Sequence, residues 1–259
     1  MQKVKKDFLN DAKLGNIIVG KNSWNKSEVR ENYFVSKIRS HASKYPVTIL
    51  IDGPDLCGKS TTVQELSKLL ESQGLSVLCC KGLISPSFFH SWLCKLDANK
   101  SHSSGLLNSL YLISAFFDRG FSFIKNDYDI LICESHVDRV IAYGLTFNLK
   151  SLAKISLSFR NFYRKFDARI LLVASHATRS DRLYNRKSPT LIDRKTCTTE
   201  TVTDFFCENF KKLYQSRECL IIPTDKKTLD VVISEIIDHL ITVISEQPSN
   251  DNFFELERK

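Results

Sequence analysis

The chain has 259 residues, of which 42% are hydrophobic and 25% charged, and its formal net charge is +8. These values are typical of a globular protein with one large α/β domain, alone or with extensions. No apolar run approaches the roughly 20 residues that span a bilayer, which excludes a transmembrane helix and favours a protein without a membrane partner.

The positive charge invites a nucleic-acid-binding interpretation, but the lysines and arginines are spread along the chain. Their densest cluster, residues 160–165, interleaves aromatic residues at helical spacing, which predicts an amphipathic helix with its aromatics inward. Nucleic-acid binding is therefore not expected. The N-terminus shows no secretory signal and the eight cysteines show no C-x-x-C spacing, so we expect a cytoplasmic protein with reduced cysteines and no zinc site.

In chain order, residues 1–44 are an N-terminal extension with one polar helix, and strand and helix signals alternate from Val47 onward. This alternation predicts a five-stranded parallel sheet flanked by helices. The expected strands are Val47–Asp52, Leu75–Cys80, Asp129–Cys133, Ala168–Ala174 and Cys219–Pro223. The expected helices are Ser27–Ser43, Thr61–Leu70, Ser104–Lys125, Val137–Leu149, Ser151–Phe166, Thr199–Gln215 and Leu229–Ile244. A polar tail follows at 247–259.

The first core strand runs directly into a glycine-rich loop that matches G-x-x-x-x-G-K-[ST] and then into a helix. Gly53 and Gly58 let the backbone wrap so that its N–H groups point at phosphate oxygens. Lys59 would reach the β- and γ-phosphates, and the Ser60 hydroxyl would bind Mg²⁺. With Thr61 opening the helix, this P-loop predicts a binding site for ATP and Mg²⁺, the two cofactors that we expect.

From Val47 to Leu240 the chain resembles the thymidylate kinase family in the order of its features. The features that carry the resemblance are Asp55 at the third P-loop position, the helix end at Ile113–Arg119, the segment Glu134–Tyr143, the set Arg182, Arg186, Asp193 and Arg194, the pair Phe205–Phe206, and the strand Cys219–Pro223. The resemblance implies a P-loop kinase fold over residues 45–246, with a lid at about 178–198 and an ATP-dependent phosphotransferase activity.

Besides Lys59, three charged residues are candidates for the chemistry of phosphoryl transfer. Arg182 and Arg186 lie one helical turn apart, so both can face one cleft and stabilise charge on the transferring phosphoryl group. The alternative is an exposed lid helix with solvated charge. Glu134 follows a buried strand beside the P-loop, where it can orient or deprotonate the acceptor or hold Mg²⁺ through water. Its alternative role is an ion pair with a nearby lysine or arginine.

The resemblance also implies an acceptor site. Asp55 would face a sugar hydroxyl of the acceptor, or would only shape the loop. Arg119 would address the acceptor base, or would form a salt bridge at the sheet edge. Tyr143 would touch the acceptor, or would pack in the core. The family's arginine for the acceptor phosphate is missing, because this chain has Lys81 in the corresponding stretch.

A second guanidinium of the family, in its Asp-Arg-Tyr triplet, is replaced by Ser135. Lys81, His136 or Arg139 would have to substitute for the lost arginines, or the acceptor carries no phosphate. We therefore expect a kinase acting on a nucleotide such as dTMP. The alternatives are a kinase of the same fold that phosphorylates a hydroxyl of a nucleoside or other small molecule, and an ATP-binding regulatory protein without activity. The expected partner is thus a small-molecule acceptor, and a homodimer stays open.

Overall fold

The structure is a computed structural model that describes residues 25–42, 46–83, 104–118, 128–147, 149–214 and 219–246. The chain divides into two units, residues 1–36 and 37–259, and helix α2 (Asn25–Ala42) runs across the division. All elements discussed below belong to the second unit. The tail at 247–259 lies outside the described residues.

The second unit alternates strands and helices from β1 onward, as the sequence predicts. Its strands are β1 (Val47–Asp52), β2 (Val77–Lys81), β3 (Ile130–Glu134), β4 (Ala168–Val173) and β5 (Leu220–Pro223). Its helices are α3 (Lys59–Ser72), α5 (Ser104–Asp118), α6 (Val137–Thr146), α7 (Lys150–Ser158), the 3₁₀ turn η1 (Arg160–Phe162), α8 (His176–Tyr184), α9 (Leu191–Thr196), α10 (Glu200–Tyr214) and α11 (Leu229–Glu246).

The five strands form one sheet with the order β2-β3-β1-β4-β5, and every pair is parallel. The expectation of a five-stranded parallel sheet flanked by helices is therefore confirmed. All residues of β1 and β3 are buried, which explains why both strands read as apolar runs rather than as alternating patterns. The P-loop strand β1 lies at the centre, between β3 and β4.

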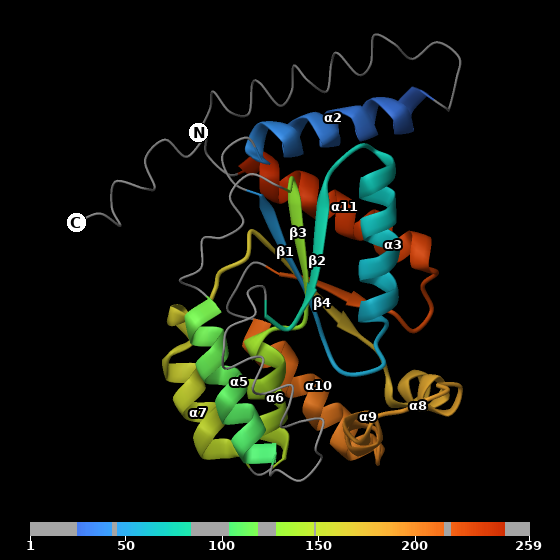
Figure 1. The fold of residues 1–259 in the computed structure, drawn as a ribbon. Helices are drawn as coiled ribbons and strands as arrows, with labels where there is room; N and C mark the ends of the chain where they lie inside the picture. The colour runs from blue at the N-terminus through green and yellow to red at the C-terminus, as the bar shows by residue number, and fades with distance from the viewer. Residues whose placement is uncertain are drawn as a thin grey trace, which may run out of the picture. The chain divides into compact units, whose positions relative to one another are not determined.

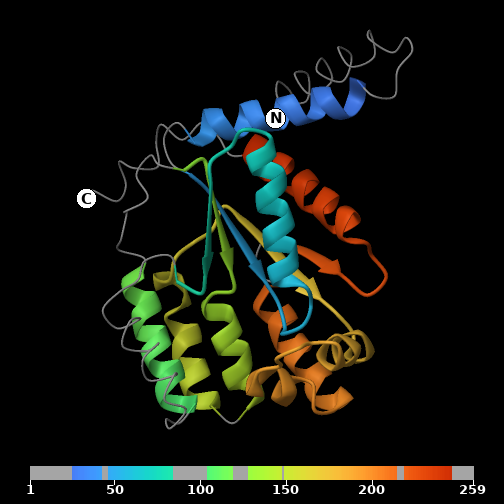
Figure 2. The same cartoon turned by 45° about the vertical axis from the view of Figure 1, so that its right-hand side comes forward.

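Helices cover the sheet in two groups, and the strand order explains the division. The connection from β1 to β2 runs one way along the sheet, whereas those from β3 to β4 and from β4 to β5 run the other way. Right-handed crossovers therefore place α3 on one face and α6, α7 and α10 on the other. Figures 1 and 2 show α3 and α11 side by side, with α6, α7 and α10 grouped apart from them. The second group shares its core with Leu171 of β4.

One helix prediction is wrong. The expected helix Ser151–Phe166 ends at Ser158 as α7 and is followed by the turn η1 and an extended segment. The chain has to extend there because Asp167, just before β4, accepts hydrogen bonds from the backbone N–H and hydroxyl of Thr48 at 2.8 and 2.7 Å. The prediction that the aromatic residues of 160–165 face inward is also wrong in part. Tyr163 is buried, but Phe162 is 49% exposed.

The segment predicted as a charged lid, residues 178–198, includes most of α8 and all of α9, with a break between the two helices. The break has a local cause: Thr190 and Asp193 form a reciprocal capping box that starts α9. Among the described residues, no helix has the length and apolar character needed to cross a membrane.

Candidate functional site

The carboxyl ends of the parallel strands meet at one edge of the sheet, where ligands bind in open α/β folds. The P-loop follows β1 at this edge and takes a glycine-dependent path. Gly53 and Gly58 have φ angles of +145° and +104°. A Cβ atom at Gly53 would lie 2.1 Å from the Leu172 carbonyl oxygen of β4, so only glycine lets the loop pass this close to the neighbouring strand.

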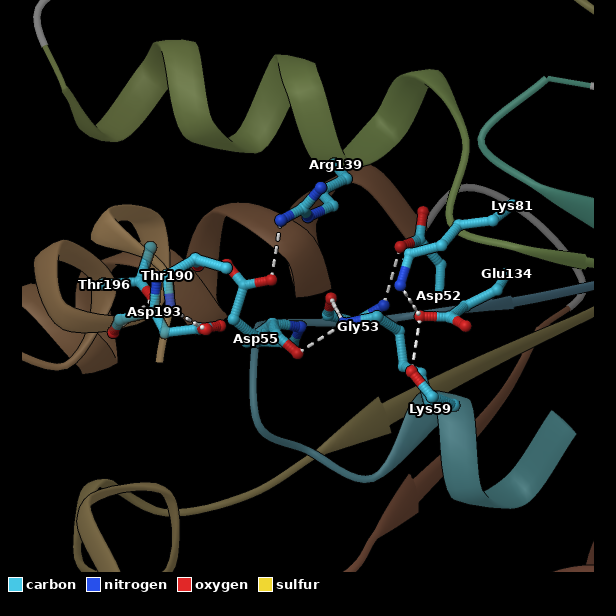
Figure 3. A network of polar contacts seen from close by, with 12 residues as sticks. Asp52, Gly53, Asp55, Lys59, Lys81, Glu134, Arg139, Thr190, Asp193 and Thr196 are labelled. Carbon is cyan, nitrogen blue, oxygen red and sulfur yellow. Dashed lines mark hydrogen bonds and ion pairs between the residues drawn. The ribbon is translucent and has the colours of Figure 1, made fainter. Parts of the chain in front are cut away.

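Lys59, at the first position of α3, is 6% exposed and lies inside the loop. Its Nζ donates hydrogen bonds to the carbonyl oxygens of Gly53 and Pro54, at 2.8 and 2.7 Å. Figure 3 shows the side chain beside the loop and near Glu134. Nζ therefore lies at the loop backbone, and the role of Lys59 toward the β- and γ-phosphates stays a prediction.

Ser60 and Glu134 are brought together by the pairing of two adjacent strands. Glu134 ends β3 in register with Ile51 of β1, and its Oε1 accepts a hydrogen bond from the Ser60 hydroxyl at 2.8 Å. The same oxygen lies 3.0 Å from the Nζ of Lys81, whose side chain is 71% exposed at the end of β2 (Figure 3). The carboxylate thus faces the P-loop hydroxyl and is also half of an ion pair.

This donor set fits Mg²⁺. Magnesium prefers oxygen ligands and is commonly held by one or two protein groups together with phosphates and water. Ser60 and Glu134 supply a hydroxyl and a carboxylate oxygen within 2.8 Å of each other, beside the helix N-terminus that would face the phosphates. Within the described parts of the chain there is no cluster of three or more His, Cys, Asp or Glu side chains that would hold a metal without such additional ligands.

Asp55 lies at the third loop position and is held by α6. Its Oδ1 accepts a hydrogen bond from Nη2 of Arg139 at 2.7 Å, and its buried Oδ2 has no hydrogen-bond partner (Figure 3). Burial raises the pKa of this carboxyl, but the charges of Arg139, Lys59 and Arg179 outweigh the burial and leave the pKa below its ordinary value. Asp55 is therefore a fixed anion with one free acceptor oxygen.

Helix α8 supports the loop from outside. Arg179, which is fully buried, donates from Nε to the Asp55 carbonyl oxygen at 2.7 Å, and Arg182 donates from Nη1 to the Leu56 carbonyl oxygen at 2.9 Å. Thr224, directly after β5, donates its hydroxyl to the Cys57 carbonyl oxygen at 3.0 Å. Sequence inspection missed Arg179 and Thr224, because neither belongs to a motif and both reach the loop only through the folded sheet.

The two candidate lid arginines do not share a helix face. Arg182 lies within α8, but α8 ends at Tyr184, and Arg186 follows in the turn beyond it. Arg186 is an ion-pair partner of Asp193, with Nη1 at 3.2 Å from Oδ2, and its side chain is 45% exposed. The expectation that one helical turn places both arginines on the same face is therefore wrong, and Arg182 contacts the P-loop backbone instead.

The remaining predicted residues are placed as follows. Tyr143 packs on Phe147, with ring centroids 4.6 Å apart, and both rings face the Nζ of Lys195 from α9. His136 is 4% exposed and lies edge-on to Phe166, so it is turned into the core and is no substitute for a phosphate-binding arginine. Thr61 is exposed in the first turn of α3. Arg119 lies outside the described residues.

No model of a known protein family matches this chain, and no curated protein has a matching sequence.

Proposed function

We propose that this protein is an ATP-dependent phosphotransferase with a P-loop kinase fold. The observation that carries the proposal is the contact between the Ser60 hydroxyl and Glu134 beside the buried Lys59. A P-loop hydroxyl and a carboxylate from the adjacent strand are the groups that hold Mg²⁺ against the phosphates in P-loop enzymes. The central position of β1, with α3 starting directly after the loop, supports the fold assignment.

In this proposal each group of the site has one task. The backbone N–H groups of the loop and Lys59 bind the β- and γ-phosphates, and Ser60 with Glu134 binds Mg²⁺. Arg186 stabilises charge on the transferring phosphoryl group after exchanging Asp193 for phosphate oxygens. The Arg186 side chain is 45% exposed and can turn away, while the buried Asp193 keeps its hydrogen bond from the Thr190 N–H at 2.8 Å.

The first candidate acceptor is a nucleotide such as dTMP, which the resemblance to thymidylate kinases favours. The second candidate is a hydroxyl of a nucleoside or other small molecule. The ion pairs of Lys81 and Arg139 favour this second candidate. Lys81 and Arg139, two of the residues that would have to substitute for the family's arginines, already form ion pairs with Glu134 and Asp55. In addition, the free Oδ2 of Asp55 accepts a hydrogen bond from a hydroxyl but repels a phosphate.

A panel of acceptors incubated with ATP and Mg²⁺ and analysed by mass spectrometry tests the proposal. Phosphorylated nucleoside monophosphates would support the first acceptor, and phosphorylated nucleosides or other alcohols alone would support the second. Binding of ATP in a Lys59-dependent manner without any product would instead favour a regulatory protein.

A Glu134→Gln variant directly tests the role of Glu134, the partner of the Ser60 hydroxyl, in binding Mg²⁺. We expect it to need about tenfold more Mg²⁺ for half-maximal ATP binding or turnover, because an amide is a weaker magnesium ligand than a carboxylate. Glu71→Gln, an exposed change on α3, is the control. An unchanged Mg²⁺ requirement in Glu134→Gln would contradict the metal assignment.

A further inference from the structure

Three consecutive carbonyl groups of the P-loop are held from outside the loop by side chains that follow it by more than 120 residues in sequence. The pairs are Arg179 with Asp55, Arg182 with Leu56, and Thr224 with Cys57, separated by 124, 126 and 167 residues. We propose that these three outer donors, Arg179, Arg182 and Thr224, are positioning residues that shape the loop for a triphosphate tail before it binds. This inference rests on the proposed function.

The geometry of the peptide bond connects the outer donors to the inner face of the loop. In a planar trans peptide the C=O and the following N–H point in opposite directions, and none of the described residues has a cis peptide bond. Holding the carbonyls of Asp55, Leu56 and Cys57 outward therefore turns the N–H groups of Leu56, Cys57 and Gly58 to the other side. Successive N–H groups on one side form an anion-binding nest.

One of the inward N–H groups, that of Cys57, has no acceptor among the residues that the structure describes. Cys57 is 0% exposed, and in the described part of the chain its N–H donates no hydrogen bond. Buried backbone N–H groups nearly always have a partner, and since this one has none among the described residues, it is available to an acceptor at the loop. Phosphate oxygens supply such acceptors.

Leu56, at the apex of the loop, shows why outside support is needed. Its φ angle is +67°, a left-handed conformation that residues with side chains rarely adopt. The two peptide groups that flank this residue are the ones held by Arg179 and Arg182, which lie three residues apart on α8. Helix α8 therefore fixes both ends of the strained residue.

The outer donors are themselves fixed in place. Arg179 also donates to the Thr196 carbonyl oxygen at the end of α9, at 3.2 Å, and its guanidinium lies 6.0 Å from the ring centre of Phe206 on α10. Arg182 also contacts the hydroxyl and carbonyl oxygens of Thr224, at 3.2 and 3.3 Å. A loop that is shaped by fixed neighbours does not have to be ordered by its ligand, which raises affinity.

Calorimetric titration with inorganic tripolyphosphate and Mg²⁺ tests the proposal, because this probe has a triphosphate chain and no nucleoside. Thr224→Val removes one outer hydroxyl at nearly constant volume, and we expect about fivefold to tenfold weaker binding. Thr48→Val is the matched control: Thr48 is 8% exposed, against 6% for Thr224, and its hydroxyl is bonded to Asp167 away from the P-loop. We expect the control substitution to lower the melting temperature by a similar amount and to leave the affinity for tripolyphosphate at the wild-type value.

The arginine pair repeats the test with a larger change. Arg182→Met, at a half-buried position, is expected to weaken tripolyphosphate binding about tenfold or more, and Arg179→Met still further. Arg169→Met removes another buried arginine, one that contacts Asp138 rather than the loop, and is expected to leave the affinity unchanged. If Arg179→Met does not fold, Arg182→Met and Thr224→Val decide the question.

The possible results separate the inference from the proposed function. Binding to wild type that is lost in Lys59→Ala, but is equally tight in Thr224→Val and Arg182→Met, would overturn the role of the outer donors and leave the P-loop function intact. No binding to wild type, of either tripolyphosphate or ATP with Mg²⁺, would overturn the proposed function itself. Weaker binding in the outer-donor variants than in their matched controls would support both.

Discussion

At the P-loop end of the site, backbone carbonyls are held by donors from α8 and the end of β5, whereas at the ends of β2 and β3 and on α6 the contacts are ion pairs between side chains. The first arrangement shapes a backbone, and the second places charges. A binding site made of backbone groups depends on many residues that never touch the ligand, so its shape changes only if the surrounding fold changes. A side-chain site can be altered by single substitutions. If the resemblance to thymidylate kinases holds, this difference explains why the P-loop motif is complete while Lys81 and Ser135 stand where that family has arginines.

The largest effect is expected for Lys59→Ala. Removing this buried cation should lower phosphoryl transfer about a thousandfold and abolish measurable binding of ATP, because in the proposed function its charge neutralises the β- and γ-phosphates. The fold should persist, since among the described residues Nζ donates hydrogen bonds to loop carbonyls and to no other element. Turnover and calorimetry measure the loss, and the melting temperature controls for folding. Unchanged turnover would reject the assignment of the P-loop.

Arg186→Ala should have the next largest effect. We expect about a hundredfold lower turnover and a much smaller change in ATP affinity, because a group that stabilises transferring charge acts mainly in the transition state. Steady-state kinetics and equilibrium binding separate the two. Equal losses in turnover and affinity would instead make Arg186 a residue that binds ATP in the ground state. It would then belong with the P-loop end of the site.

Arg139→Met distinguishes the two ends of the site. The substitution frees the second oxygen of Asp55 and removes a charge from the acceptor end, so the KM for the acceptor should change about tenfold. The affinity for ATP with Mg²⁺ should stay within about twofold, because the outer donors and Lys59 are untouched. A loss of ATP affinity as large as the change in acceptor KM would show that the two ends are not separable.

The smallest effect concerns acid stability. The pKa of Asp55 is lower in the folded protein than its ordinary value of 3.8, mainly through Arg139 against the opposing effect of burial. As the pH falls, Asp55 therefore takes up its proton at a higher pH in the unfolded chain than in the folded protein. The stabilisation by the Asp55 charge is fully present above the unfolded pKa and is lost as the pH falls through the folded pKa.

Denaturant titrations of wild type and Asp55→Asn between about pH 2 and pH 7 measure this effect. The difference in the free energy of unfolding should be constant above about pH 5 and should shrink below it. A difference independent of pH would mean that the Asp55 charge does not stabilise the fold.

The sequence predicts those parts of the molecule whose causes are local. The five strands are apolar runs, and the residues Gly53 to Ser60 form a contiguous motif, so both could be read along the chain. Glu134 is predictable as a site residue because it ends a buried strand and adjacent parallel strands align their carboxyl ends. The end of α7 at Ser158 was missed because it depends on Asp167 reaching Thr48, a contact across 119 residues.

The outer donors could not be predicted for the same reason. Arg179 reads as a solvated lid charge, since nothing near it in sequence requires burial. Thr224 is an ordinary residue after a strand. Only the packing of α8 and the end of β5 against the P-loop gives either residue its contact.

Amide NMR of the ¹⁵N-labelled protein, with a non-hydrolysable ATP analogue and Mg²⁺ added, tests the central claim most directly. We predict that the largest shifts occur at the N–H groups of Leu56, Cys57 and Gly58, because these are the groups turned toward the phosphates. Shifts confined to other parts of the chain, or no shifts at saturating analogue, would contradict a triphosphate site at this loop.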